Sequence, residues 1–335
     1  MEITKSVAEF LTSRPPLTDP AFTKWGVTLL GMLTLAQFTR KTIEFLTPYL
    51  LPSRLNKFKH TLQNQSNKEK PWAVVTGSTD GIGKGFALEL AAQGFNLILI
   101  GRNPDKLANL EKELRAVAAD CQTATYVSDA SKIQEKTTQD FSHLVRLIGS
   151  KPVTVLVNNV GRSTAKLANL TELEDQDIVD VININDVYPT LLTKQLLPTL
   201  VSNSPSLILN VGSMAGDHGF PFMTVYSGTK AYNKAWSRGL SVEMKMLEHK
   251  IQVQHLLVGS VNSGSNKVSV SITSPTSRVF ARSALKVTTT RKIVAPYFWH
   301  ALQMRIFEAL PEWVIDTMLI GMIGQIKANI GSKEE

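Results

Sequence analysis

The chain has 335 residues, of which 43% are hydrophobic, which is enough for one large domain with additional segments at its ends. Its net charge of +8 does not make it a nucleic-acid-binding protein, because Lys and Arg are spread along the chain and no nucleic-acid motif is present. The single cysteine, Cys121, excludes an intrachain disulfide and fits a reducing compartment, and the six histidines lack metal-ligand spacing, so no metal site is predicted.

The N-terminal part contains an apolar run that could associate with a membrane. Residues 1–20 are polar and proline-rich and are predicted to be flexible. The uncharged run 25–38 is shorter than the roughly 20 residues of a straight membrane span, but the apolar pattern resumes after Arg40 and Lys41. We therefore predict a membrane anchor over residues 21–52, either as a short span or as an interfacial helix, with a buried helix as the alternative. Residues 53–70 are predicted to be a basic linker, whose charges place the following domain on the cytoplasmic side if the anchor spans.

A glycine-rich turn follows the linker. Residues 71–75 form a short apolar strand, and residues 84–91 begin a helix. Glycines between them permit close backbone approach, and the free N–H groups of the helix start attract a pyrophosphate. The turn is therefore predicted to bind a dinucleotide through Gly77, Ser78, Thr79, Asp80, Gly81, Ile82 and Gly83.

The next two strands carry residues suited to the adenosine half of such a cofactor. The strand 95–100 is followed by Arg102. A basic residue there accommodates the 2′-phosphate of NADP, whereas an acid would bind the 2′-hydroxyl of NAD. Arg102 thus favours NADPH, with Lys84 adding positive charge, although a solvated arginine at a helix start is the alternative. Asp129, after the strand 124–127, is predicted either to reach the adenine or to cap a helix.

A serine, a tyrosine and a lysine suggest chemistry at the far end of the sheet. Ser213 follows the apolar strand 207–211 and a glycine, so it lies where open parallel sheets bind ligands. Tyr226 and Lys230 are four residues apart and share one helix face. Such a pair alone is commonly a surface contact, but beside Ser213 the ammonium would favour the phenolate form and make the phenol a usable acid or base. Ser213 and Tyr226 are therefore predicted to contact a ketone substrate.

The ordered motifs Thr-Gly-x-x-x-Gly-x-Gly, Asn-Asn-x-Gly at residues 158–161, Ser213 and Tyr-x-x-x-Lys resemble the short-chain dehydrogenase/reductase family over residues 71–265. The resemblance implies an α/β fold, a Rossmann-type doubly wound parallel sheet with helices on both faces. It implies cofactor contacts from Asn158, Tyr226 and Lys230, and assembly into a homo-oligomer. It also implies a fourth catalytic residue, an asparagine in a proton relay to the lysine, and Asn185 matches that position better than Asn183 by its distance to Thr193.

A closer resemblance is to the very-long-chain 3-oxoacyl-CoA reductase subgroup, related to 17β-hydroxysteroid dehydrogenase types 3 and 12, and rests partly on residues 274–285 and 295–302. It implies NADPH-dependent reduction of a long-chain 3-oxoacyl-CoA at the cytosolic face of the endoplasmic reticulum membrane, with other elongase components as partners. Val261 and Ser263 would contact the nicotinamide. Val258 and Ser263 replace the family's proline and threonine, and residues 264–266 are small and polar. A membrane-bound reductase of a steroid or polyketide ketone, and a catalytically idle scaffold without NADPH binding, therefore remain alternatives.

The C-terminal part, residues 266–335, is predicted to supply a substrate loop and apolar helices. Its apolar stretch 313–323 contains a single acid, Asp316. This stretch is expected to lie on a membrane or to close over a lipid-sized pocket; a core or dimer helix is the equal alternative.

Overall fold

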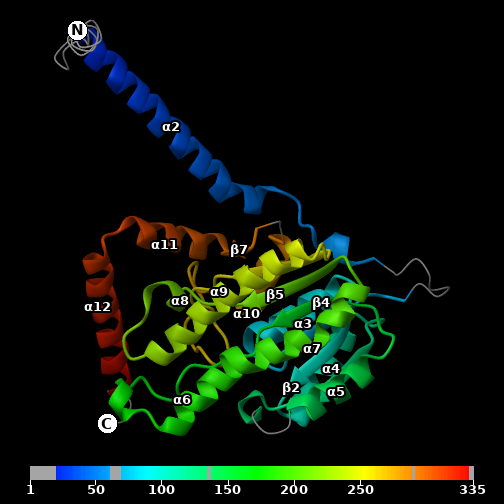
Figure 1. The fold of residues 1–335 in the computed structure, drawn as a ribbon. Helices are drawn as coiled ribbons and strands as arrows, with labels where there is room; N and C mark the ends of the chain where they lie inside the picture. The colour runs from blue at the N-terminus through cyan, green and yellow to red at the C-terminus, as the bar shows by residue number, and fades with distance from the viewer. Residues whose placement is uncertain (1–19, 61–68, 134–136, 289–290, 332–335) are drawn as a thin grey trace, which may run out of the picture. The chain divides into compact units, whose positions relative to one another are not determined.

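The computed structural model describes residues 20–60, 69–133, 137–288 and 291–331 and separates into two units, which meet in sequence between Leu51 and Pro52 (Figure 1). The predicted flexible segment, apart from Pro20, lies outside the described residues.

The first unit is the helix α2, Pro20–Leu50, with Pro48 in its last turn. The hydroxyls of Thr28 and Thr34 donate to carbonyls four residues earlier, so the polar group of each side chain is bonded to the helix backbone. Its apolar side chains are exposed, Trp25 at 73% and Leu30 at 65%. Across the described ranges, no helix is both long and apolar enough to cross a bilayer.

The second unit is built on a seven-stranded sheet in which neighbouring strands are parallel. The order β3-β2-β1-β4-β5-β6-β7 reverses direction between β1 and β4, which places the ligand-binding edge at the carboxyl ends of these central strands. The predicted doubly wound sheet is confirmed. The strands are β1 Trp72–Thr76, β2 Asn96–Gly101, β3 Thr123–Val127, β4 Val153–Asn158, β5 Ser206–Val211, β6 Ile251–Leu256 and β7 Ile293–Val294.

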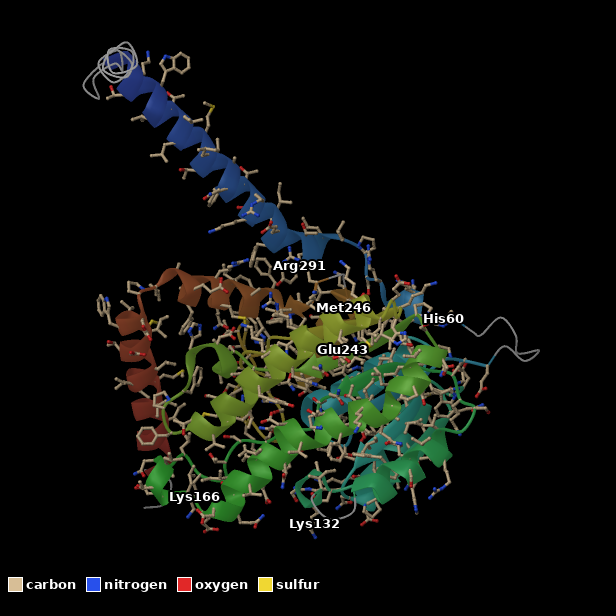
Figure 2. The ribbon with its side chains drawn as sticks, in the orientation of Figure 1. His60, Lys132, Lys166, Glu243, Met246 and Arg291 are labelled. Carbon is tan, nitrogen blue, oxygen red and sulfur yellow. The ribbon has the colours of Figure 1, made fainter. Side chains whose placement is uncertain are left out.

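Helices cover both faces of this sheet (Figure 1), and every residue of the strands β1, β2, β4 and β5 is therefore buried. Successive strand residues point to opposite faces, so Val75 packs in one core and Val74 in the other. The first core lies under α3 Gly81–Ala92, α4 Pro104–Val117 and α10 Ser277–Lys286. The second lies under α5 Thr137–Ile148, α7 Tyr188–Ser202 and α9 Thr224–Met246. Glu243 and Met246, near the end of α9, are exposed (Figure 2).

Shorter elements connect these layers. They are η1 Leu55–Phe58, η2 Ala130–Lys132, η3 Leu170–Glu172, α6 Asp175–Ile182, the π-helical turn η4 Asn183–Val187 and α8 Ala215–His218.

The described part of the predicted linker, residues 53–60, belongs to the second unit and packs on its first core. Leu55 and Phe58 are buried in the first core. The hydroxyl of Ser53 donates to the Leu285 carbonyl at 2.6 Å, and that of Thr154 donates to the Phe58 carbonyl at 2.7 Å. Leu55 and Phe58, three residues apart, thus bury one side of this stretch, while Arg54 and Lys57 are exposed.

The C-terminal helices are α11 Phe298–Ala309 and α12 Glu312–Gly331. In α12, Ile315, Leu319 and Ile323 recur every four residues and are buried, while Trp313 and Ile320 are exposed. A cavity of about 580 Å³ lies between α12 and the helices α8 and α9. One face of α12 thus packs on the rest of the second unit, and other apolar side chains of α12 are exposed.

Candidate active site

The glycine-rich turn between β1 and α3 has the geometry predicted for a phosphate-binding loop. Gly77 and Gly81 have φ angles of 59° and 51°, in the left-handed region that favours glycine. A Cβ on Gly83 would overlap the carbonyl oxygen of Gly77, so the turn closes only without a side chain there. Asp80 caps α3, since its carboxylate accepts from the Gly81 N–H at 2.6 Å. The turn therefore presents backbone N–H groups at the end of β1.

Thr76 and Asn159, which the sequence analysis did not assign as site residues, fix this turn to the end of β4. The Thr76 hydroxyl oxygen accepts from the N–H groups of Asn159 and Val160 at 2.9 and 3.0 Å. The Asn159 amide donates back to the Thr76 carbonyl at 3.0 Å. The second Asn of Asn-Asn-x-Gly was the available signal, because it follows a buried strand directly.

The first Asn of that motif, Asn158, has a structural use. Its amide donates to the Thr193 hydroxyl at 2.9 Å and to the Asn210 side chain at 2.8 Å. It is 3% exposed and joins β4 to β5 and α7 beneath the site. Its side chain therefore supports the strand ends, and a cofactor contact from Asn158 stays a prediction.

The residues predicted for the adenosine half lie at the ends of β2 and β3. Arg102 is exposed directly after Gly101, where a Cβ would lie 3.0 Å from the Thr79 methyl group of the glycine-rich turn. Lys84 forms an ion pair with Glu113 at 2.8 Å, and a contribution of its charge to the cofactor site stays a prediction. Asp129 caps η2 by accepting from the Ser131 N–H at 3.1 Å, in line with the capping alternative.

The predicted catalytic residues Ser213, Tyr226 and Lys230 meet at the carboxyl end of β5. Lys230 is 5% exposed, and its Nζ lies 5.5 Å from the centroid of the Tyr226 ring and donates to the Val211 carbonyl at 3.4 Å. The Ser213 hydroxyl oxygen accepts from the Ala215 N–H at 3.1 Å, which leaves the hydroxyl proton available to a ligand. The ammonium is thus held beside the phenol by burial and by the strand end.

His255 explains the glycine that precedes Ser213. A Cβ on Gly212 would overlap the imidazole of His255, which is fully buried and contacts the Asn233 side-chain oxygen at 3.0 Å. Burial, and then the positive charges of Lys230 and Lys234, lower the pKa of His255 to about 3. His255 is therefore a neutral packing group.

Asn185 lies in the π-helical turn η4 with its side chain fully engaged. Its amide donates to the Arg162 carbonyl and the Thr229 hydroxyl, both at 2.9 Å, and its oxygen accepts from the Arg162 N–H at 2.9 Å. A Cβ on Gly161 would lie 3.2 Å from both Asn185 Oδ1 and Lys230 Nζ, so these groups meet beside Gly161. Asn183 instead donates to the Ser131 carbonyl, away from this cluster. The choice of Asn185 over Asn183 therefore agrees with its position.

Next to Asn185, the carboxyl group of Asp186 is unusual. One of its oxygens is buried without a hydrogen-bond partner in the described structure. Burial raises the pKa of Asp186 to about 7, against the opposing effect of the Lys230 charge. The catalytic corner, by which we mean Ser213, Tyr226, Lys230 and Asn185, thus has beside it an acid whose pKa is near neutrality.

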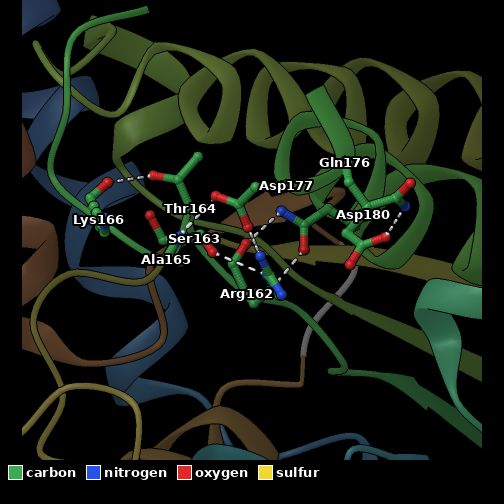
Figure 3. A network of polar contacts seen from close by, with 9 residues as sticks. Arg162, Ser163, Thr164, Ala165, Lys166, Gln176, Asp177 and Asp180 are labelled. Carbon is green, nitrogen blue, oxygen red and sulfur yellow. Dashed lines mark hydrogen bonds and ion pairs between the residues drawn. The ribbon is translucent and has the colours of Figure 1, made fainter. Parts of the chain in front are cut away.

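The segment after the Asn-Asn-x-Gly motif is held against α6 by a second polar network (Figure 3). Arg162 forms an ion pair with Asp177 of α6, and the same carboxylate accepts from the Ala165 N–H at 2.8 Å. Figure 3 shows this network between the segment and the first turn of α6. Arg162 was missed because its sequence neighbours give no sign of a partner fifteen residues later.

The segment after β6 reaches the glycine-rich turn. Val261 is buried, while Ser263 lies near the turn: a Cβ on Gly81 would be 3.1 Å from that of Ser263. The neighbouring Gly264 lies so close to Asp80 that a Cβ there would overlap its carboxylate. The Ser263 hydroxyl accepts from the Asn266 N–H at 3.1 Å. The predicted nicotinamide segment and the phosphate-binding turn are thus adjacent.

A doubly wound sheet with a glycine-rich turn at its switch point and a buried lysine beside a tyrosine defines a dinucleotide-dependent oxidoreductase of the Rossmann class. The family model described as "short chain dehydrogenase" matches residues 71–271. The chain belongs to the short-chain dehydrogenase family, which confirms the resemblance seen in the motifs.

Two relatives illustrate the similarity. The chain is 35% identical to a very-long-chain 3-oxoacyl-CoA reductase of Mycosarcoma maydis over 64% of its own length and 61% of that protein, so the match spans about three fifths of this relative. It is 30% identical to a protein of the same name from Pyricularia oryzae, over 93% of this chain and 90% of that one. Among solved structures, a short-chain dehydrogenase from Sphingobium yanoikuyae in complex with NADPH superposes with a TM-score of 0.59, at 22% identity, over 72% of this chain and 96% of that chain. This last likeness supports the fold.

Proposed function

We propose that the protein reduces a ketone to a secondary alcohol with NADPH, and that its substrate is a long-chain 3-oxoacyl-CoA of very-long-chain fatty-acid elongation. The observation that carries the reaction type is the buried Lys230 ammonium beside Tyr226, with Ser213 at the same strand end. The substrate proposal is supported by the names of the relatives from Mycosarcoma maydis and Pyricularia oryzae.

The residues of the site can account for the proton side of this reaction. Bound NADPH would supply the hydride to the carbonyl carbon. Ser213 would donate its free hydroxyl proton as a hydrogen bond to the carbonyl oxygen, and Tyr226 would transfer its phenol proton to that oxygen as the alcohol forms. Lys230 would stabilise the resulting phenolate, and Asn185, whose side-chain oxygen lies with Lys230 Nζ beside Gly161, would support the proton relay that reprotonates Tyr226.

The choice of cofactor is testable at Arg102. Its exposed guanidinium follows β2, next to the glycine-rich turn, which suits a 2′-phosphate. We expect Arg102→Ser to raise the KM for NADPH about tenfold or more and to leave the KM for NADH unchanged. Arg115→Ser, on the exposed side of α4, is the matched control. Equal changes for both cofactors would contradict the role of Arg102.

The substrate proposal is tested with a panel of ketones. NADPH oxidation by the full-length protein would be followed with long-chain 3-oxoacyl-CoA, a steroid ketone and a polyketide ketone. We expect the highest kcat/KM for the acyl-CoA. A higher kcat/KM for the steroid or the polyketide ketone would contradict the acyl-CoA substrate. It would favour the alternative of a steroid or polyketide reductase, which the small polar residues 264–266 leave open. Absence of NADPH binding would instead support the idle-scaffold alternative.

We also propose that α2 attaches the protein to the cytosolic face of the endoplasmic reticulum membrane, near other elongase components. Exposed apolar side chains such as Leu30 and Leu33 would enter the lipid interface. We expect Leu30→Lys with Leu33→Lys to abolish co-flotation with lipid vesicles, whereas charge added at exposed Val127 of β3 should not. Glycosylation of the exposed sequon Asn169 in cells would contradict the cytosolic orientation. A homo-oligomer stays a prediction.

A further inference from the structure

His300, in the first turn of α11, is a buried polar residue outside the four catalytic positions. It is 1% exposed and packs against the rings of Phe280 and Tyr297, with centroid distances of 5.9 and 5.0 Å. Its hydrogen bonds go to backbone groups of the segment 259–273 that follows β6. This segment contains Val261 and Ser263, the predicted nicotinamide contacts.

Both ring nitrogens of His300 have partners, and these fix its protonation state. The N–H of Gly259 donates to Nδ1 at 3.2 Å, so Nδ1 carries no proton. Nε2 must then carry the proton, and it faces the Ser260 carbonyl at 2.9 Å and the Thr273 carbonyl at 3.2 Å. Burial lowers the pKa of His300 against the opposing effect of these two carbonyls, which favours the same neutral ring.

His300 therefore joins the two ends of the segment. Gly259 and Ser260 lie before the nicotinamide contacts, and Thr273 lies after them. Tyr297, one turn earlier at the start of α11, adds a bond from its hydroxyl to the Ile272 carbonyl at 2.9 Å. The fit is close, because a Cβ on Gly259 would lie 2.7 Å from the imidazole.

We infer that His300 is a positioning residue that clamps both ends of the segment 259–273 and thereby places Val261 and Ser263 for the nicotinamide half of the cofactor. The clamp consists of contacts within this chain, whereas its effect on the cofactor rests on the proposed NADPH-dependent function. Loss of the clamp should loosen one wall of the cofactor site and leave the glycine-rich turn unchanged.

The test compares His300→Leu with His300→Asn in the full-length protein, by hydrogen exchange without ligand and by NADPH titration. His300→Leu removes all three hydrogen bonds of the imidazole, while the Asn side chain can restore the acceptor for Gly259. Tyr297→Phe removes only the bond to Ile272 and guards against a failure of the Leu variant to fold. His143→Leu, on the exposed face of α5, is the matched control.

In His300→Leu we expect faster exchange over 259–273, unchanged exchange over 76–83, and NADPH affinity about fivefold to tenfold weaker, with partial recovery in His300→Asn. Tyr297→Phe should accelerate exchange only near residue 272. Unchanged exchange over 259–273, an equal rise throughout the domain, or unaltered NADPH affinity despite a loosened segment would each overturn the inference. If the wild-type protein itself fails to bind NADPH, the proposed function falls and the positioning role falls with it.

Discussion

The two halves of the site are built in different ways. The nucleotide half, around residues 76–83, is fixed by backbone geometry, with two glycines at positive φ and a third with no room for a side chain. The catalytic half is fixed by buried polar side chains, since Asn185, Lys230 and His300 each bond to backbone atoms of segments distant in sequence. The first half is thus encoded locally, and the second depends on the assembled fold.

This difference predicts which changes each half tolerates. A backbone turn should fail when any atom is added, whereas a polar network should lose function stepwise as individual bonds are removed. The expected effects therefore decrease from the glycine turn to the edge of the catalytic corner.

The largest effect is expected for Gly83→Ala. The new methyl group would lie 2.2 Å from the Gly77 carbonyl oxygen, and this overlap with backbone atoms can be relieved only by a shift of the turn. We expect the free energy of unfolding to fall by about 3 kcal/mol and NADPH binding to be lost. Gly239→Ala is the control, because nothing lies within 4 Å of its Cβ position on α9 and a helical alanine should be neutral or stabilising. Chemical denaturation of both variants measures the free energy of unfolding, and titration measures their affinity for NADPH. If Gly83→Ala bound NADPH as tightly as the wild type, the close contact between Gly83 and Gly77 would not be needed for the cofactor site.

A smaller effect is expected for Asn185→Asp. The carboxylate can still accept from the Arg162 N–H, but it cannot donate to the Arg162 carbonyl or the Thr229 hydroxyl. Two buried acceptors are left without their donor, so unfolding should become easier by about 2 kcal/mol, with kcat reduced more than the KM for NADPH. A change in the KM for NADPH alone, with kcat unaltered, would show that Asn185 acts in nucleotide binding and not in the catalytic half of the site. Asn183→Asp serves as the neighbouring control.

The same contrast decides what could be predicted from the sequence. The strand, glycine turn and helix at 71–91 lie within about twenty residues, so their pattern predicts their structure. The doubly wound parallel sheet and the family followed from the resemblance that four ordered motifs carry. The role of Asp177 could not be predicted, because its partner Arg162 meets it only through the path of the chain between β4 and α6. His300 likewise bonds to backbone atoms about forty residues away, which no side-chain spacing reveals.

The smallest effect is a pH dependence at Asp186. Its pKa is about 7 in the folded protein and has an ordinary value of 3.8. Between these pH values the unfolded carboxyl is ionised while the folded one keeps its proton, so stability falls as pH rises from about 4 to about 7. Asp186→Asn should remove this slope and stabilise the protein by about 1–2 kcal/mol above pH 7, with no gain near pH 4. Denaturation curves at several pH values measure the slope; Asp180→Asn, on α6, is the control, and a parallel shift at all pH values would exclude this cause.

The central claim is that Tyr226 transfers a proton to a ketone in an NADPH-dependent reduction. The direct measurement is 3-hydroxyacyl-CoA formation, by mass spectrometry, in membranes containing the full-length protein, NADPH and a long-chain 3-oxoacyl-CoA. The account predicts one product per NADPH oxidised and a rate at least about a hundredfold lower for Tyr226→Phe, with Tyr232→Phe like the wild type. Equal rates for the wild type and Tyr226→Phe would contradict the assigned acid, and NADPH binding without product would contradict the acyl-CoA substrate.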